Sequence, residues 1–391
     1  MHASALSILE NKKDINLAVA SVYEGREFEK FKSKGVKYYL LPQAKNNRTY
    51  DPKLEKKWKL IKKEFQPSIV HIHGTEYPHG LAYLRACGSE NVVVSIQGLV
   101  SICERYYYGN ISTWDMLKNI TIRDLIRRDT IFAQRRDMKK RGYYEKEVLL
   151  SAKNIIGRTF WDSTHIWANN PTARYYFCNE TLRPLFYQHQ WVYENCEKNS
   201  IFISQAHSPI KGFYQIIRAL PIILGCYPKT KVYVAGIDFI NKSYWRIGGY
   251  GKLIKTLIKR LGLGNYIVFT GPLSEEEMCQ RLMRSHVFVS PSSIENSSNS
   301  ISEAQLIGVP CVASYVGGIE DMVKNNETGL VYRFEEFEML AKGICGLFAD
   351  QDLAQRISGG ARKVAAARHN KELNKNRLME IYSNICKNIS Q

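Results

Sequence analysis

The sequence predicts an α/β protein built of two doubly wound domains that face each other across a cleft. Two observations predict this fold class. Short apolar or β-branched runs alternate with longer amphipathic stretches, which is typical of βαβ units and of parallel sheets covered on both faces. The alternation runs in two series, which the polar segment ENCEKN at 194–199 separates. We therefore expect one domain at 1–195, a second at 196–370, and a helix at 371–391 that packs back on the first.

The first series contains five predicted strands, at Leu17–Val22, Val36–Leu40, Ile69–His73, Val92–Ile96 and Ile155–Arg158. The chain opens in a helix-like stretch, Met1–Asn11, where a βαβ series normally opens with a strand and a glycine-containing turn. We therefore expect the usual first strand of this domain to be missing or replaced.

The stretch Trp114–Leu150 interrupts the alternation, because apolar residues are spaced there by basic ones. Basic residues outnumber acidic ones by 11 to 5 between Lys118 and Lys153. The plain interpretation is a helical hairpin on the first domain. The alternative is an amphipathic basic surface for an anionic membrane.

The second series contains five more predicted strands, at Ser200–Ser204, Lys231–Ala235, Ile267–Phe269, Val287–Val289 and Pro310–Ala313. Amphipathic helices are predicted between them, at Tyr214–Leu224, Gly251–Leu261 and Glu275–Arg284. In doubly wound domains ligands bind at the carboxyl ends of the strands.

Composition narrows the class of protein. The net charge of +18 favours anionic partners, but no nucleic-acid recognition motif accompanies it, so we expect no nucleic acid. No apolar run is long enough to span a membrane and no export signal opens the chain, which favours the cytoplasm. The nine cysteines form no CxxC pair, so free thiols are expected. His71 and His73 alone are a weak metal pair, and we expect neither a metal nor a cofactor.

The segment Ser290–Tyr332 carries most of the chemistry. Glu295 and Glu303 flank a small polar loop, NSSNSIS, and a predicted helix begins within it. Backbone N–H groups at a helix start form an anion site suited to a diphosphate. The residues that would supply these groups are Asn299, Ser300 and Ile301. A carboxylate after them can accept hydrogen bonds from a ribose diol, and one before them can meet sugar hydroxyls. Either glutamate alone would be read as an ordinary helix or loop acid.

This segment resembles the donor-site motif of the family-4 retaining glycosyltransferases, also called glycosyl transferase group 1. Its paired glutamates have seven residues between them, and E-A, G-x-P, V-A-S, G-G and G-L-V follow. FISQAHSPIKGF, VYVAG, NYIVFTGPLSEEEM and VFVSPS extend the likeness through the second domain, and PSIVHIHG and VVVSIQG extend it to the first. The resemblance implies the GT-B fold, with two facing Rossmann-like domains.

The resemblance also implies roles for residues. Glu303 would hold the donor ribose, and Glu295 would contact the transferred sugar. Lys211 would neutralise the diphosphate leaving group, which gains negative charge as it departs. The family packs the nucleobase near the positions of Gly271 and Pro272, and the backbone of residues 299–301 would bind the distal phosphate.

The sequence departs from the family pattern at two further places. The usual arginine before the lysine is absent, and Gln205, Ala206 and His207 stand in its region. Gln205 is the donor-site candidate among them. The missing charge could come from other arginines, namely Arg174, Arg183 or Arg218. On the acceptor side, Gln97 precedes Gly98 where many members have a histidine, and His73 is a further candidate there.

The expected function is transfer of a sugar, with retained anomeric configuration, from a UDP- or GDP-sugar to an acceptor hydroxyl. The acceptor would be a glycan or lipid-linked glycan in surface polysaccharide assembly, with peripheral association at an anionic membrane. The alternative is a non-catalytic GT-B protein that binds nucleotide or acts as a scaffold. Weaker alternatives are a nucleic-acid binder and a nucleotide-sugar epimerase of the same fold.

Overall fold

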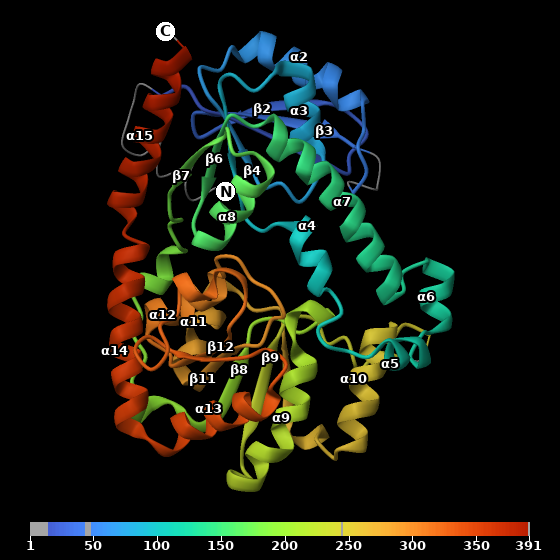
Figure 1. Cartoon of the computed structure of the whole chain (residues 1–391), viewed down its shortest axis with the longest axis vertical. Helices are drawn as coiled ribbons and strands as arrows, with labels where there is room; N and C mark the ends of the chain where they lie inside the picture. Colours follow the sequence, from blue (N-terminus) through green and yellow to red (C-terminus); the bar gives the residue numbers. More distant parts are fainter. Residues whose placement is uncertain (1–14, 44–47, 244, 390–391) are drawn as a thin grey trace. The chain divides into compact units, whose positions relative to one another are not determined.

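The computed structural model describes residues 15–43, 48–243 and 245–389, which form two compact units (Figure 1). Unit 1 contains residues up to Glu104, Asp137–Thr181 and the segment from Asn370 onward. Unit 2 contains Arg105–Arg136 and Leu182–His369. The expectation about the chain's opening, including Met1–Asn11, lies outside the described residues.

Unit 1 contains two sheets. The larger has the order β4-β5-β6-β7 and is parallel throughout; its strands are Val70–His73, Val92–Ser95, Asn154–Gly157 and Arg174–Phe177. The smaller has the order β1-β3-β2, with β1 (Ala18–Tyr23) parallel and β2 (Glu29–Ser33) antiparallel to β3 (Val36–Pro42). All four residues of both β5 and β6 are buried, because they are central strands of a parallel sheet.

The helices of unit 1 pack on these sheets. They are α2 (Lys53–Phe65), α3 (His79–Cys87), α4 (Val100–Cys103), α8 (Phe160–Asn169) and α15 (Lys371–Ile389); α7 (Ile131–Ser151) begins among the unit 2 residues and continues here. The fully buried side chains Ile381 and Ile385 of α15 pack against Val93 and Ile156 of the parallel sheet. Burial of this apolar stripe fixes α15 on the sheet.

Unit 2 is a doubly wound domain with one six-stranded parallel sheet of order β10-β9-β8-β11-β12-β13. In chain order its strands are β8 (Glu197–Ile203), β9 (Lys231–Ala235), β10 (Ile267–Gly271), β11 (Ser285–Ser290), β12 (Cys311–Ser314) and β13 (Leu330–Tyr332). The chain adds strands on one side of β8 and then on the other. The switch point of the topology therefore lies between β8 and β11, where doubly wound folds bind ligands.

Six helices of unit 2 connect or follow these strands: α9 (Phe213–Cys226), α10 (Gly249–Arg260), α11 (Glu275–Arg284), α12 (Asn299–Ile307), α13 (Phe337–Ala349) and α14 (Gln351–Arg368). In Figure 1, α9 and α13 lie side by side against the sheet. Short 3-10 turns occupy Glu104–Tyr106, Pro184–Tyr187 (η2), Tyr193–Asn195, Pro209–Lys211 (η4), Gly264–Tyr266 and Gly317–Asp321 (η6).

The predicted α/β class with parallel sheets is confirmed, and each of the ten predicted strands overlaps an observed one. The pattern of apolar runs in the sequence did not predict three of the observed strands, β2, β7 and β13. Each of these is an edge strand of its sheet, and all five residues of β2 are exposed. An edge position alone does not hide a strand, because the predicted strands β1, β4 and β10 lie at edges too. β2 leaves no hydrophobic pattern because none of its residues is buried.

The predicted hairpin at Trp114–Leu150 is wrong. The stretch instead forms three helices, α5 (Thr113–Lys118), α6 (Ile122–Arg127) and α7, and the first two belong to unit 2. The reason is a set of contacts with the start of α10. The Thr121 hydroxyl donates to the Ile247 carbonyl (3.2 Å), and the Asp124 carboxylate accepts from the Gly249 N–H (2.7 Å). The predicted ranges are 1–195, 196–370 and 371–391. The two observed units differ from them because residues 105–136 belong to unit 2 and because unit 2 resumes at Leu182.

Candidate functional site

The carboxyl edge of the unit 2 sheet brings Lys211 and Glu295 together. Lys211 ends η4, which follows β8, and Glu295 lies in the loop after β11. The Lys211 ammonium donates to Glu295 Oε1 (2.7 Å), and the Ser292 hydroxyl donates to the same oxygen (2.7 Å). Both charged side chains are partly buried, at 29% and 16% exposure. A cation and a carboxylate are thus held at the topological switch point.

Two glycines allow this geometry. Gly212 has φ +68°, and a Cβ there would lie 1.6 Å from the Pro291 carbonyl oxygen. Gly317 has φ +55°, and a Cβ there would lie 2.0 Å from the Glu295 carbonyl oxygen. That same carbonyl accepts the N–H of Gly318 (3.0 Å). Only glycine fits both the left-handed conformation and the close approach, so the K-G and G-G motifs have a direct structural reason.

Glu303, in the first turns of α12, is paired with Arg183. The guanidinium donates from Nε to Oε1 (2.8 Å) and from Nη2 to Oε2 (2.9 Å), and it stacks on the Phe186 ring at 4.5 Å. Burial raises the pKa of Glu303, and Arg183 opposes that rise. The sequence offers three arginines as sources of the missing positive charge. Of these, Arg183 contacts Glu303, a predicted donor-binding residue.

The start of α12 follows Glu295 in the chain, and Glu303 lies on the same helix. Ser298 is its N-cap residue, but the Ser298 side chain makes no capping hydrogen bond and instead contacts the Ser300 hydroxyl (3.0 Å). The first intrahelical bond runs from the Ser302 N–H to the Ser298 carbonyl. The backbone N–H groups of the first turn, including those of Asn299 and Ile301, thus precede the helical ladder and suit an anion.

The remaining predicted donor residues lie on other loops of the same edge. Gly271 ends β10 with φ +78°, and Pro272 follows it on the surface. Gln205 and His207 are exposed in the loop between β8 and η4. Partial desolvation, followed by the positive charge of Lys211, lowers the pKa of His207, so its neutral form is favoured.

The acceptor-side candidates lie in unit 1, in a network that the sequence did not reveal. The Gln97 side chain donates to Glu180 Oε1 (2.6 Å) and accepts from Arg158 Nη2 (3.0 Å), while Arg158 Nη1 pairs with Glu180 Oε2 (2.8 Å). Burial opposes the Glu180 charge, but Arg158 and Gln97 outweigh it, so the pKa of Glu180 is lowered. Glu180 and Arg183 are only three residues apart in the chain, but they have different partners. Pairs of residues far apart in the chain leave no local signal.

His73 stacks on His71, with ring centroids 3.8 Å apart. His71 contacts the Tyr382 hydroxyl and the Ser95 hydroxyl through its two ring nitrogens. Burial lowers the pKa of His71 well below its usual value and that of His73 to about 4. Both rings are therefore neutral at physiological pH. Among the described residues, no group of three or more His, Cys, Asp or Glu side chains could hold a metal ion.

A buried carboxylate lies beneath the loop of Gly98. Glu145 of α7 is fully buried and accepts from the N–H groups of Val100 (3.0 Å) and Ser101 (2.9 Å) and from the Ser101 (2.6 Å) and Thr75 (2.9 Å) hydroxyls. It thereby caps the start of α4. Burial raises the pKa of Glu145 to about 7, although its hydrogen bonds oppose the rise.

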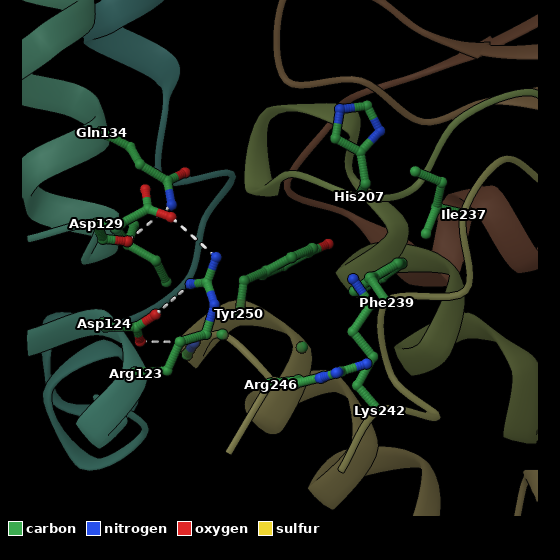
Figure 2. Close-up of a pocket in the computed structure, with 14 residues that line it drawn as sticks. Arg123, Asp124, Asp129, Gln134, His207, Ile237, Phe239, Lys242, Arg246 and Tyr250 are labelled. Carbon is green, nitrogen blue, oxygen red and sulfur yellow. Dashed lines mark hydrogen bonds and ion pairs between the residues drawn. The ribbon is translucent and has the colours of Figure 1, made fainter. Parts of the chain in front are cut away.

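A pocket of about 310 Å³ lies in unit 2, between α6, the start of α7 and the segment that leads into α10 (Figure 2). Arg123, Lys242 and Arg246 line it together with His207, while Tyr250 and Phe239 stack in parallel at 5.5 Å. No sequence signal pointed to this pocket, because its walls are about 120 residues apart in the chain.

Comparisons with known proteins find relatives of the segment that contains these residues. The family described as Glycosyl transferases group 1 matches residues 189–364. The GDP-mannose-dependent alpha-(1-6)-phosphatidylinositol monomannoside mannosyltransferase of Mycobacterium tuberculosis is 25% identical over 166 residues, which are 41% of this chain and 40% of that protein. The chain thus spans about two fifths of the length of the curated relatives that it matches first.

Solved structures resemble the chain over most of its length. Sucrose-phosphate synthase from Thermosynechococcus elongatus aligns with a TM-score of 0.74 at 16% identity, over 98% of this chain and 92% of that one. Anabaena HepE in complex with UDP-glucose aligns with a TM-score of 0.60 at 17% identity, over 85% and 81%. At such identities the likeness establishes the fold. The chain therefore has the GT-B fold, and its segment 189–364 matches the group 1 glycosyltransferase family.

Proposed function

We propose that the protein is a retaining glycosyltransferase that moves a sugar from a UDP- or GDP-sugar to an acceptor hydroxyl, in surface polysaccharide or glycan assembly. The observation that carries the proposal is the convergence of Lys211, Glu295, Glu303 and the start of α12 at the switch point of unit 2. These groups supply the contacts that a nucleoside diphosphate sugar requires.

Each group has a task in this proposal. The start of α12 and the Lys211 ammonium bind the diphosphate without a metal. Glu303 accepts hydrogen bonds from the ribose hydroxyls through the lone pairs that Arg183 leaves unused. Glu295 contacts the hydroxyls of the transferred sugar, and Gly271 and Pro272 lie beside the nucleobase. Arg183 holds Glu303 in position, and Gln205 lines the donor side.

The transfer step follows from this arrangement. The acceptor oxygen bonds to the anomeric carbon as the bond from that carbon to the diphosphate oxygen breaks, and the electron pair stays on that oxygen. The acceptor proton passes to the leaving phosphate on the same face, so the configuration is retained. Lys211 stabilises the negative charge that develops on the phosphate. Glu295 and Glu303 are both held by cations, which supports the phosphate rather than a protein carboxylate as the proton acceptor.

The acceptor side belongs to unit 1 in this proposal. His73, Gln97 and Gly98 lie at the carboxyl ends of β4 and β5, which is where doubly wound sheets bind ligands. The Gln97 amide is already oriented by Glu180 and Arg158, so it can present a fixed polar group to an acceptor hydroxyl.

Calorimetry with UDP, GDP and their sugar conjugates tests the donor site, with Lys211→Ala as the site variant. Lys229→Ala is the matched control, because Lys229 is an exposed lysine just before β9, at the amino edge of the same sheet. We expect one nucleotide to bind the wild type and the control, and to bind Lys211→Ala at least tenfold more weakly. Equal binding by all three would contradict the site.

Transfer is tested separately with the donor that binds. Turnover of that sugar nucleotide, with an α-configured product from an α-configured donor in NMR spectra, is the expected result. Nucleotide binding without turnover on any glycan or lipid-linked acceptor would instead favour the non-catalytic alternative.

A further inference from the structure

An exposed apolar face covers α5 and α6 of unit 2. On α6, Ile122, Leu125 and Ile126 are 46%, 62% and 78% exposed, and their spacing places them on one side of the helix. On α5, Trp114 and Leu117 are 64% and 47% exposed at the same i, i+3 spacing. A short surface helix normally buries its apolar side. Here α6 exposes it and buries an aspartate, Asp124, at 2% exposure instead.

The segment that precedes α10 carries two more exposed apolar side chains. Ile237 and Trp245 are 65% and 69% exposed, and they flank Lys242. We call the seven exposed side chains of the two segments the docking face: Trp114, Leu117, Ile122, Leu125, Ile126, Ile237 and Trp245.

The two segments of the docking face are joined by hydrogen bonds. Asp124 accepts from the Gly249 N–H, and the Lys252 ammonium donates to the Lys118 carbonyl (3.4 Å). A Cβ on Gly249 would lie 2.8 Å from Asp124 Oδ2, so glycine permits the close approach of α6 to α10. The α5 and α6 part of the docking face is therefore held against α10 by hydrogen bonds.

The two segments that carry the docking face are rich in basic residues. Residues 105–136 contain seven basic and three acidic residues, and residues 237–252 contain three basic and one acidic residue. The acids are engaged within the segments: Asp124 and Asp129 pair with Arg123, Asp115 contacts the Ser112 hydroxyl, and Asp238 contacts Asn241. Arg123 is thus engaged with two of these acids, whereas no acid among the described residues of the two segments pairs with Lys242 or Arg246.

We propose that the docking face lies on an anionic lipid bilayer, with its apolar side chains in the interfacial layer. Lys242 and Arg246, which line the pocket in Figure 2, meet lipid phosphates at its mouth. Tryptophan and branched apolar side chains beside lysine and arginine are the composition of interfacial segments. A second copy of the chain is a poorer occupant, because a symmetric interface would bring the ten basic residues of each copy together.

This proposal adds to the proposed function that the protein would meet a lipid-linked acceptor at the membrane surface. Membrane binding itself does not require that the protein transfer a sugar. The proposal also differs from the expectation drawn from the sequence. That expectation covered the whole stretch Trp114–Leu150, whereas the exposed apolar side chains lie on α5, α6 and the segment before α10.

Vesicle sedimentation with the full chain tests the proposal. We expect binding to phosphatidylcholine vesicles that contain phosphatidylglycerol, and at least tenfold weaker binding to pure phosphatidylcholine. The variant Leu125→Glu/Ile126→Glu should lower the affinity for anionic vesicles at least tenfold. Met339→Glu/Val364→Glu, at exposed apolar positions of α13 and α14 in the same unit, is the matched control and should bind as the wild type does.

A second pair of double variants tests the contribution of the basic side chains Lys242 and Arg246. Lys242→Gln/Arg246→Gln should weaken binding to anionic vesicles severalfold, whereas Arg356→Gln/Lys363→Gln removes the same charge from exposed positions of α14 with little effect. Equal losses in both double variants would mean adsorption by net charge alone and would overturn the proposal. Bromolipid quenching of tryptophan fluorescence, reduced in Trp114→Phe/Trp245→Phe, is expected only if the face enters the bilayer.

Two further outcomes would also overturn it. One is wild-type protein that ignores anionic vesicles. The other is a concentration-dependent dimer in sedimentation analysis that Leu125→Glu/Ile126→Glu abolishes, which would make the docking face a contact between copies. Circular dichroism establishes that each variant is folded. Nucleotide binding measured on the same variants should not change, so a failure here is distinguishable from a failure of the donor site.

Discussion

Arg183 binds both carboxylate oxygens of Glu303 in a parallel, bidentate pair, with N–O distances of 2.8 and 2.9 Å. The two residues are 120 positions apart, and the pair fixes a carboxylate at the start of the helix that the donor diphosphate is proposed to meet. Bidentate pairs add geometric precision as well as energy, so Arg183 is a positioning residue for Glu303.

The first prediction concerns this pair. Arg183→Lys replaces two parallel hydrogen bonds by a single point charge, so Glu303 loses its fixed orientation. The Kd of the donor nucleotide should rise about tenfold, which corresponds to about 1.4 kcal/mol. Arg281→Lys is the matched control, because Arg281 pairs with Glu197 at the start of β8, on the amino edge of the same sheet. Calorimetry that gives the same Kd for both variants would remove Arg183 from the site.

The second prediction separates turnover from binding at Glu295. Glu295→Gln keeps the size of the side chain but removes the charge that pairs with Lys211 and faces the transferred sugar. We expect kcat to fall about 100-fold, the scale of losing one electrostatic contact made in the transition state, while donor Kd changes less than threefold. Glu327→Gln, at an exposed loop position of unit 2, should leave both constants unchanged. A large rise in Kd with unchanged kcat would assign Glu295 to binding alone.

The third prediction concerns pH and Glu145. Its folded-state pKa of about 7 lies above the ordinary value of 4.5, so the folded protein holds this proton more tightly than the unfolded chain does. The stabilisation is therefore fully present below pH 4.5 and is lost as pH rises to about 7, at up to about 1.4 kcal/mol per pH unit.

Urea unfolding of wild type and Glu145→Gln across pH 4.5–7.5 measures this contribution. The unfolding free energy of the wild type should fall relative to that of Glu145→Gln as pH rises through that window, because only the wild type loses a proton there. Glu147→Gln is the control, since Glu147 is on the same helix and pairs with Arg85 near the surface. A difference that stays constant with pH would mean that the buried carboxylate keeps its ordinary pKa.

The fourth prediction concerns the glycine after Lys211. In Gly212→Ala the new Cβ would lie 1.6 Å from the Pro291 carbonyl, at φ +68°. We expect a loss of about 2 kcal/mol or more in unfolding free energy, and weaker nucleotide binding because η4 must shift. Gly225→Ala, near the end of α9 with open space around its Cβ, should be neutral or slightly stabilising. Thermal unfolding with and without nucleotide measures both effects.

The sequence by itself determined the α/β class, ten of the strands and the glutamate–lysine motif of unit 2. These features are local. A buried strand is a continuous apolar run, and the K-G and G-G turns must be glycine because of the backbone conformation at Gly212 and Gly317. Such constraints act on neighbouring residues and are therefore visible in the order of the letters.

Only the tertiary structure decided which unit residues 105–136 join, which cation holds Glu303, and that Glu180 pairs with Arg158 rather than Arg183. It also revealed the docking face, since the exposure of Leu125 and Ile126 follows from the burial of Asp124 against Gly249. Each of these facts depends on contacts between segments far apart in the chain. An amino-acid pattern specifies which groups are able to pair, but the packing of the whole unit selects the pairs that form.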